Sequence, residues 1–106
     1  MTRFLIQATY TADGSKGLIK DGGSGRKAAV EKAVAGVGGR LESFYYALGA
    51  TDAFVVVDVP DAVTAVAISL AVNATGAVRT SLTQLLTVDE MDAACKKTVA
   101  YRAPGA

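Results

Sequence analysis

Histidine is absent from this chain of 106 residues, and so is tryptophan. Histidine is the side chain most often used as a general base, and it completes the Ser-His and Cys-His pairs that activate nucleophiles. Without it, acid–base chemistry must fall to Asp, Glu, Tyr or Lys. Because histidine is also the commonest metal ligand, we expect no metal and no histidine-ligated cofactor.

Cysteine is almost absent, since Cys95 is the only one. A single cysteine cannot form a disulfide within the chain. It lies on the expected inner stripe of the last helix, together with Met91 and Ala94. We therefore expect Cys95 to be buried as a small hydrophobic residue, and not to act as a nucleophile.

Concentrated charge and long apolar runs are missing too. The formal net charge is +1, and the basic residues are dispersed, which disfavours nucleic-acid binding. The most apolar region, residues 53–72, is interrupted by two aspartates and a proline, so it is not expected to cross a membrane. The N-terminus lacks the pattern of a signal peptide. We expect one domain over residues 1–106, in the reducing cytoplasm.

What the sequence does contain is a clear alternation of strand and helix patterns. Period-two hydrophobicity predicts strands over 3–10, 41–48, 53–59 and 78–86. Helical spacing and capping residues predict a weak helix over 11–20 and firmer helices beginning at Ser24, Asp61 and Thr87. The order β-α-β-β-α-β plus a C-terminal helix predicts an α+β fold, the ferredoxin-like sandwich.

Both faces of the predicted sheet carry apolar side chains. In the strand over 53–59, Val55 and Val57 point to one side, whereas Phe54 and Val56 point to the other. A sheet that is apolar on both faces has to be covered on both. Two helices cover one face, and a second sheet is the simplest cover for the other. The sequence therefore predicts a homodimer or a higher oligomer, with itself as the partner.

Polar side chains also point into the open layer of the predicted sheet. Apolar walls with a few converging polar groups describe a ligand pocket, but they describe a plain interface equally well. Tyr45 and Tyr46 are consecutive, so one of them belongs to each face. The candidate pocket residues are Gln7, Thr9, Tyr45, Tyr46, Asp52 and Arg79.

Two carboxylates flank the apolar strand over 53–59. Asp52 is expected to close the turn that precedes the strand, because aspartate side chains accept hydrogen bonds from nearby backbone in turns. Asp58 is expected to lie in water at the strand end.

A glycine-rich segment, Gly23-Ser24-Gly25-Arg26-Lys27-Ala28, matches the spacing of a dinucleotide-binding loop. That loop must directly follow a strand, and the predicted strand ends far upstream, so we reject the motif. A weaker possibility is an anion site at a helix N-terminus, formed by Ser24, Gly25 and Arg26. The simpler interpretation, which we favour, is a flexible loop leading into a capped helix.

Residues 49–61, from Gly49-Ala50-Thr51-Asp52 through the apolar strand to Pro60-Asp61, resemble the GYD domain family, which is named for a Gly/Tyr/Asp motif beside such a strand. Residues 40–46 and 76–80 and the opening strand resemble it as well. Thr51 stands where the tyrosine is expected, so no role of that phenol carries over. The resemblance implies a dimeric α/β barrel in which two sheets face each other. Relatives by fold include stress-response proteins and small monooxygenases.

Two functions remain open from the sequence. The first is a non-catalytic oligomeric module, either structural or binding a small molecule between the sheets, with a stress-related role suggested by fold relatives. The second is a cofactor-independent enzyme, monooxygenase- or isomerase-like, acting on a small organic substrate in the barrel cavity. That enzyme would use Tyr45 or Tyr46 with Asp52 or Arg79. The absence of histidine favours the module.

Overall fold

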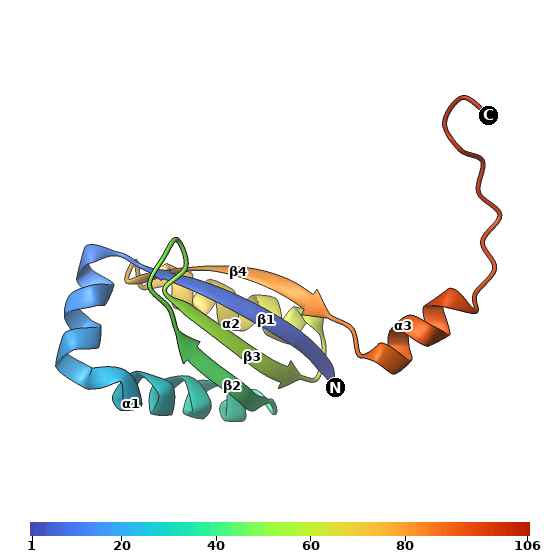
Figure 1. Cartoon of the computed structure of the whole chain (residues 1–106). Helices are drawn as coiled ribbons and strands as arrows, with labels where there is room; N and C mark the ends of the chain where they lie inside the picture. The colour runs from blue at the N-terminus through green and yellow to red at the C-terminus, as the bar shows by residue number, and fades with distance from the viewer.

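The computed structural model describes residues 1–106 and consists of one sheet with three helices (Figure 1). The strands form an antiparallel sheet in the order β2-β3-β1-β4. This arrangement confirms the predicted α+β fold, a ferredoxin-like sandwich with a C-terminal helix. None of the helices has the combination of length and hydropathy that a membrane span needs. The elements in chain order are β1 (Thr2–Tyr10), α1 (Ala12–Gly36), β2 (Arg40–Tyr46), β3 (Ala53–Val59), α2 (Ala62–Ala74), β4 (Val78–Leu85) and α3 (Val88–Cys95).

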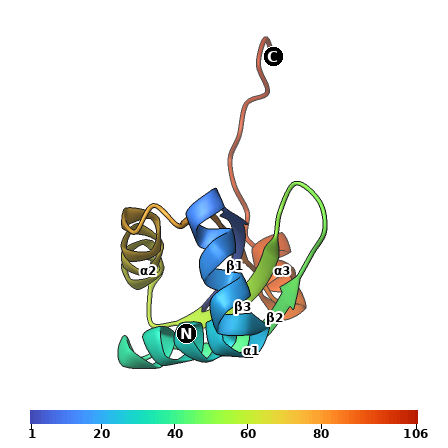
Figure 2. The same ribbon diagram turned by 90° about the vertical axis from the view of Figure 1, so that its left-hand side faces the viewer.

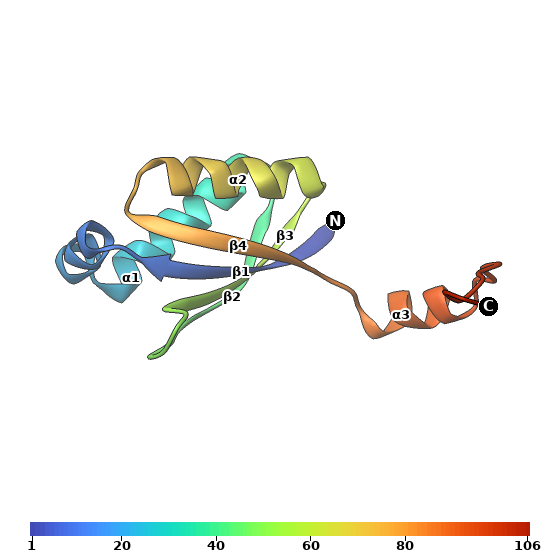
Figure 3. The same cartoon turned by 90° about the horizontal axis from the view of Figure 1, so that it is seen from above.

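Helices α1 and α2 lie on the same side of the sheet, as the view from above shows (Figure 3). The period-two alternation of β1 and β3 turns Phe4, Ile6, Val55 and Val57 toward these helices, where all four are buried. Val34 of α1 is fully buried against them. The hydrophobic core therefore lies between the sheet and α1–α2, and the opposite sheet face carries no helix.

Helix α1 is sharply bent, because it contains both helices that the sequence predicts separately. Thr11 caps its start, accepting a hydrogen bond from the Gly14 amide at 3.2 Å. Gly22 interrupts the helix with φ 75° and ψ 165°, a conformation that glycine adopts readily. Beyond it, the second half of α1 runs beneath the sheet (Figure 2). The break therefore lies two residues before Ser24, which makes no capping hydrogen bond.

The other predicted helix starts are confirmed by their caps. The Asp61 carboxylate accepts a 2.8 Å hydrogen bond from the Thr64 amide at the start of α2. Thr87 and Glu90 form a complete capping box at the start of α3, each side chain accepting from the other's backbone amide.

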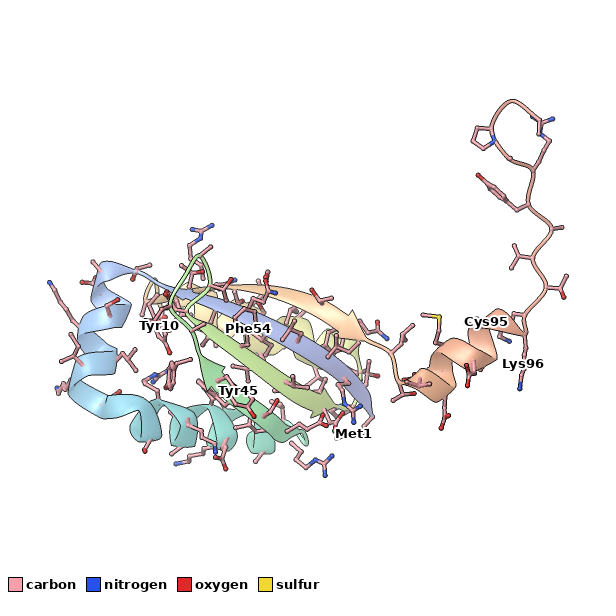
Figure 4. The ribbon with its side chains drawn as sticks, in the orientation of Figure 1. Met1, Tyr10, Tyr45, Phe54, Cys95 and Lys96 are labelled. Atoms are coloured by element: carbon pink, nitrogen blue, oxygen red, sulfur yellow. The ribbon has the colours of Figure 1, made fainter.

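Helix α3 corrects the expectation for Cys95. The helix continues away from the end of β4, and Cys95 and Lys96 lie on it far from the sheet (Figures 1 and 4). No residue of α3 is buried, and Cys95 is exposed. The predicted inner stripe exists in the sequence, but a single chain offers nothing for it to pack against.

Asp58 is a second correction, because its side chain is buried at the end of β3 and not in water. Arg40 of β2 donates a 2.8 Å hydrogen bond to the carboxylate, and Nε of Arg3 in β1 lies 3.4 Å from it. Arg3 also pairs with Glu42 at 2.7 Å. The two neighbouring strands thus supply arginines that cover the strand end. The hydrogen bond from Arg40 lowers the pKa of Asp58, although burial opposes this effect.

We predict that Asp58→Asn lowers the free energy of unfolding at pH 7 by about 1–2 kcal/mol. The effect is limited because Arg40 is exposed, so water screens part of its attraction to Asp58. The pKa of Asp58 is lower in the folded state than in the unfolded state. The ionised carboxylate therefore contributes its full stabilisation at pH values above the unfolded pKa. This contribution is lost as pH falls through the folded value, over roughly pH 5 to 2.

Urea unfolding at fixed protein concentration should show a smaller acid dependence for Asp58→Asn than for wild type. Asp92→Asn, which removes an exposed carboxylate of α3, serves as the control. Equal acid dependence in wild type and Asp58→Asn would contradict the account.

Two glycines of α1 give a matched pair of predictions. A Cβ on Gly14 would overlap the carbonyl oxygen of Ala77, whereas a Cβ on Gly17 would meet nothing within 4 Å. Gly14→Ala should therefore destabilise the protein by about 1–3 kcal/mol. Gly17→Ala should stabilise it by up to about 1 kcal/mol, because alanine favours the helix. Thermal unfolding checks both, and a stabilising Gly14→Ala would show that α1 does not approach residue 77 so closely.

Candidate functional site

The open face of the sheet has an apolar centre and polar ends. Strand pairing places two rows across its middle, Ser43–Val56–Leu5–Thr83 and Tyr45–Phe54–Gln7–Ser81. Tyr45 is 70% exposed and Phe54 is 36% exposed. The row Arg40–Asp58–Arg3 closes one end with charges, and Thr9 pairs with Arg79 at the other. In a single chain, bulky apolar side chains on this face stand in contact with water.

The predicted pocket residues do not converge. Gln7, Thr9, Tyr45 and Arg79 lie on the open face, but Tyr46 lies on the helix side, next to buried Ala53. The period-two alternation of β2 requires this separation of the two tyrosines. The sequence therefore grouped residues from two different surfaces.

Asp52, which the sequence places in the turn before β3, also joins that turn to the end of β1. Its carboxylate accepts a 2.8 Å hydrogen bond from the Tyr10 amide, and its own amide donates to the Ala8 carbonyl at 2.9 Å. Its carbonyl accepts from the Ala47 amide at 2.8 Å. These bonds fasten the β2–β3 hairpin to the end of β1. One carboxylate oxygen is thus already committed to the backbone.

Tyr10 lies at the end of β1 beside the first half of α1 (Figure 4), and it lines clefts on both sides of that helix. The first cleft has a volume of about 390 Å³ and is also lined by Leu18, Gly23, Tyr46 and Asp52. The Tyr46 hydroxyl donates to the Gly23 carbonyl at 3.0 Å, which fixes the ring beneath the bend of α1. The Phe44 ring packs against it, with centroids 4.9 Å apart.

The Tyr46 hydroxyl has a raised pKa. Burial is the main cause, Tyr10 adds to the rise, and the positive charge of Arg26 opposes it. The raised pKa keeps this phenol protonated to a higher pH than an ordinary tyrosine, and the protonated hydroxyl donates to the Gly23 carbonyl.

The second cleft has a volume of about 330 Å³ and lies between the first half of α1 and the C-terminal end of α2. Asp13, Asp21 and Arg26 line it together with Tyr10. Arg26 and Tyr10 also line an inner pocket of about 60 Å³ between the sheet and the helices, whose walls are mostly apolar. The outer cleft thus adjoins a small apolar pocket in the helix layer.

The predicted anion site is separated in the same way. Ser24 and Gly25 are exposed on α1, whereas Arg26 lines the cleft and lies 3.9 Å from the Asp21 carboxylate. Sequence reasoning missed Tyr10, although the alternation of β1 already assigns it to the helix side. It also missed Asp13 and Asp21, because their meeting with Arg26 depends on the bend at Gly22.

The polar groups are distributed between these clefts. Tyr46 and Asp52 line the first, and Arg26 lines the second together with Asp13 and Asp21. No three acidic or cysteine side chains gather in the geometry of a metal site.

The raised pKa of Tyr46 can be measured directly. In an alkaline absorbance titration, we expect one phenol to ionise above the ordinary value of about 10. Tyr46→Phe should remove this last transition, whereas Tyr101→Phe, in the exposed C-terminal tail, should leave it. A late transition that survives in Tyr46→Phe would contradict the assignment of the raised pKa to Tyr46.

Comparison with known proteins gives one finding. The model of the GYD domain matches residues 4–95, from β1 to the end of α3. No curated protein and no solved structure matches the chain. Since the family match spans the whole sheet and all three helices, the chain belongs to the GYD domain family.

Proposed function

We propose that this chain functions as a self-associating module, in which two copies pack their open sheet faces together and each copy binds a small molecule beside its helices. The apolar centre of the open face carries the proposal. Leu5 of β1 lies beside Phe54 and Val56 of β3 on two paired strands, and no helix covers them. An apolar centre with aromatic side chains and a polar rim is the usual composition of a protein–protein interface.

Sheet-to-sheet packing fits the dimensions of this face. Four strands about 4.8 Å apart, each about seven residues long, give a flat area of roughly 440 Å². A stable interface usually buries about 800 Å² on each partner. The sheet face therefore supplies a large part of the required area, and a further element is needed to complete it.

Helix α3 is the element available for this purpose. Val88 is 78% exposed and Met91 is 51% exposed, so the helix presents apolar side chains to water. A helix of eight residues is not stable without packing. In the proposed pair, α3 of each copy packs against the other copy. The dimeric barrel implied by the resemblance to the GYD family supports the same pairing.

The polar groups around Tyr10 favour binding over catalysis. The Asp52 carboxylate already accepts a hydrogen bond from the Tyr10 amide. The residues of the enzyme hypothesis are divided between the open face and the helix side. The clefts around Tyr10, in contrast, have volumes of about 330 and 390 Å³, which lie within the usual range of ligand sites.

Association is tested by placing one charge on either side of the molecule. Val56→Lys puts an ammonium group into the centre of the open face, and Val63→Lys puts one on the outer face of α2, where Val63 is 79% exposed. Sedimentation equilibrium at micromolar concentration should show an oligomer for wild type and Val63→Lys, and the 10.8 kDa monomer for Val56→Lys.

A second variant distinguishes loss of association from loss of folding. Thr83→Lys changes an exposed residue of the edge strand β4 on the same face, and it should weaken association with an unchanged circular dichroism spectrum. A wild-type monomer would refute the proposal. Dissociation by Val63→Lys alone would do so too, because it would move the interface to α2.

A further inference from the structure

The inner pocket lies where the helix layer of the sandwich stays open. Helix α1 packs on β2 and α2 packs on β4. Side chains of the sheet form the bottom of the space between the two helices. The pocket holds about 60 Å³, and its walls include Ile6, Phe44, Val55 and Ile68. One water-sized atom needs about 10–15 Å³ by this measure, so the space fits about four to six heavy atoms of an apolar group.

Arg26 is the only charged residue that lines this apolar pocket, and it lines the outer cleft as well. The Arg26 side chain thus lies at the junction of the two spaces, with 31% of it exposed. It makes no hydrogen bond within the chain, and its one ion-pair partner, Asp21, lies at the distant value of 3.9 Å. Several of its five donors are therefore free to meet a ligand.

Apart from the Tyr10 hydroxyl, the other polar side chains of the pocket are already satisfied. The hydroxyls of Ser69 and Thr80 bond to each other, and Thr80 also donates to the Asn73 side chain through its amide and its hydroxyl. A ligand's polar group thus gains most at Arg26. Its free donors favour a ligand group that accepts hydrogen bonds and carries a negative charge.

The neighbouring carboxylates limit the charge of that anion. Asp13 and Asp21 line the same outer cleft as Arg26. In this cleft a dianion such as a phosphate ester would meet two carboxylates for one guanidinium, which is unfavourable. A monoanion can form the bidentate pair with Arg26 while its apolar part leaves the charged cleft for the inner pocket.

We propose that the pocket between α1 and α2 binds a small apolar monocarboxylic acid, with its carboxylate on Arg26 and its hydrocarbon part among the side chains of the inner pocket. This inference rests on the small-molecule binding in the proposed function, and it specifies the place and the class of the ligand. It is independent of the open sheet face, which lies on the other side of the sheet.

The test is a titration of the ¹⁵N-labelled full chain with hexanoate, followed by amide chemical shifts. Hexanoate offers a tail of about five carbons, which matches the size of the inner pocket. At up to about 10 mM, a range suited to a ligand this small, we expect saturable shifts at Val30, Val72 and Val78, which line the pocket. The amides of Leu5, Phe54 and Val56 on the open face should not shift.

Two comparisons isolate the role of the charge. Hexanamide has the same tail without the carboxylate, and it should bind wild type at least about tenfold more weakly. Arg26→Gln should weaken hexanoate binding to a similar degree, and Arg26→Lys should recover part of it. Lys27→Gln, which removes the adjacent exposed charge, should bind hexanoate like wild type.

Three results would overturn the inference: no saturable shift in wild type, equal binding of hexanoate and hexanamide, or equal effects of Arg26→Gln and Lys27→Gln. The proposed association fails separately. Val56→Lys tests the oligomer and should leave hexanoate binding intact, whereas Arg26→Gln should leave the sedimentation of the protein unchanged.

Discussion

A four-stranded sheet has two faces, and this chain supplies helices for one of them. The remaining features of the molecule depend on that imbalance. On the covered side, valines and phenylalanines build a core in which Val34, Val57 and Val59 are fully buried. On the other side, Phe54 and Val56 extend the same apolar character into water. Hydrophobic burial is the main favourable term in folding and association, so the uncovered face is where a second molecule gains most.

The two ends of the sheet are specialised in different ways. At one end, Arg3 and Arg40 enclose Asp58, so charges from three strands fix the register of the sheet beside the open face. At the other end, the bend of α1 at Gly22 raises the first half of the helix beside Tyr10 and leaves clefts on both of its sides. A straight α1 would not place Arg26 next to the pocket in the helix layer. The proposed binding site and the proposed interface thus occupy opposite sides of one sheet.

The sequence predicts the elements of this fold well, because periodicity and caps are local properties. The alternation in residues 53–59 and the caps at Asp61 and Thr87 are sufficient for that purpose. The site is harder, because it depends on which elements meet. The sequence predicts an exposed Asp58 because its arginine partners come from other strands, and it predicts a buried Cys95 although α3 does not join the core. Arg26 was identified for its charge near a helix start, but its cleft becomes visible only with the bend of α1 and the position of α2.

The central claim is that the open sheet faces of two copies pack against each other. An isotope-filtered NOE experiment on a mixture of ¹³C-labelled and unlabelled protein detects only contacts between different molecules. The account predicts intermolecular NOEs from the methyl groups of Leu5 and Val56 to the rings of Phe54 and Tyr45. Intermolecular NOEs confined to the methyl groups of Val63, Val66 and Leu70 on the outer face of α2, or no intermolecular NOEs at all, would contradict it.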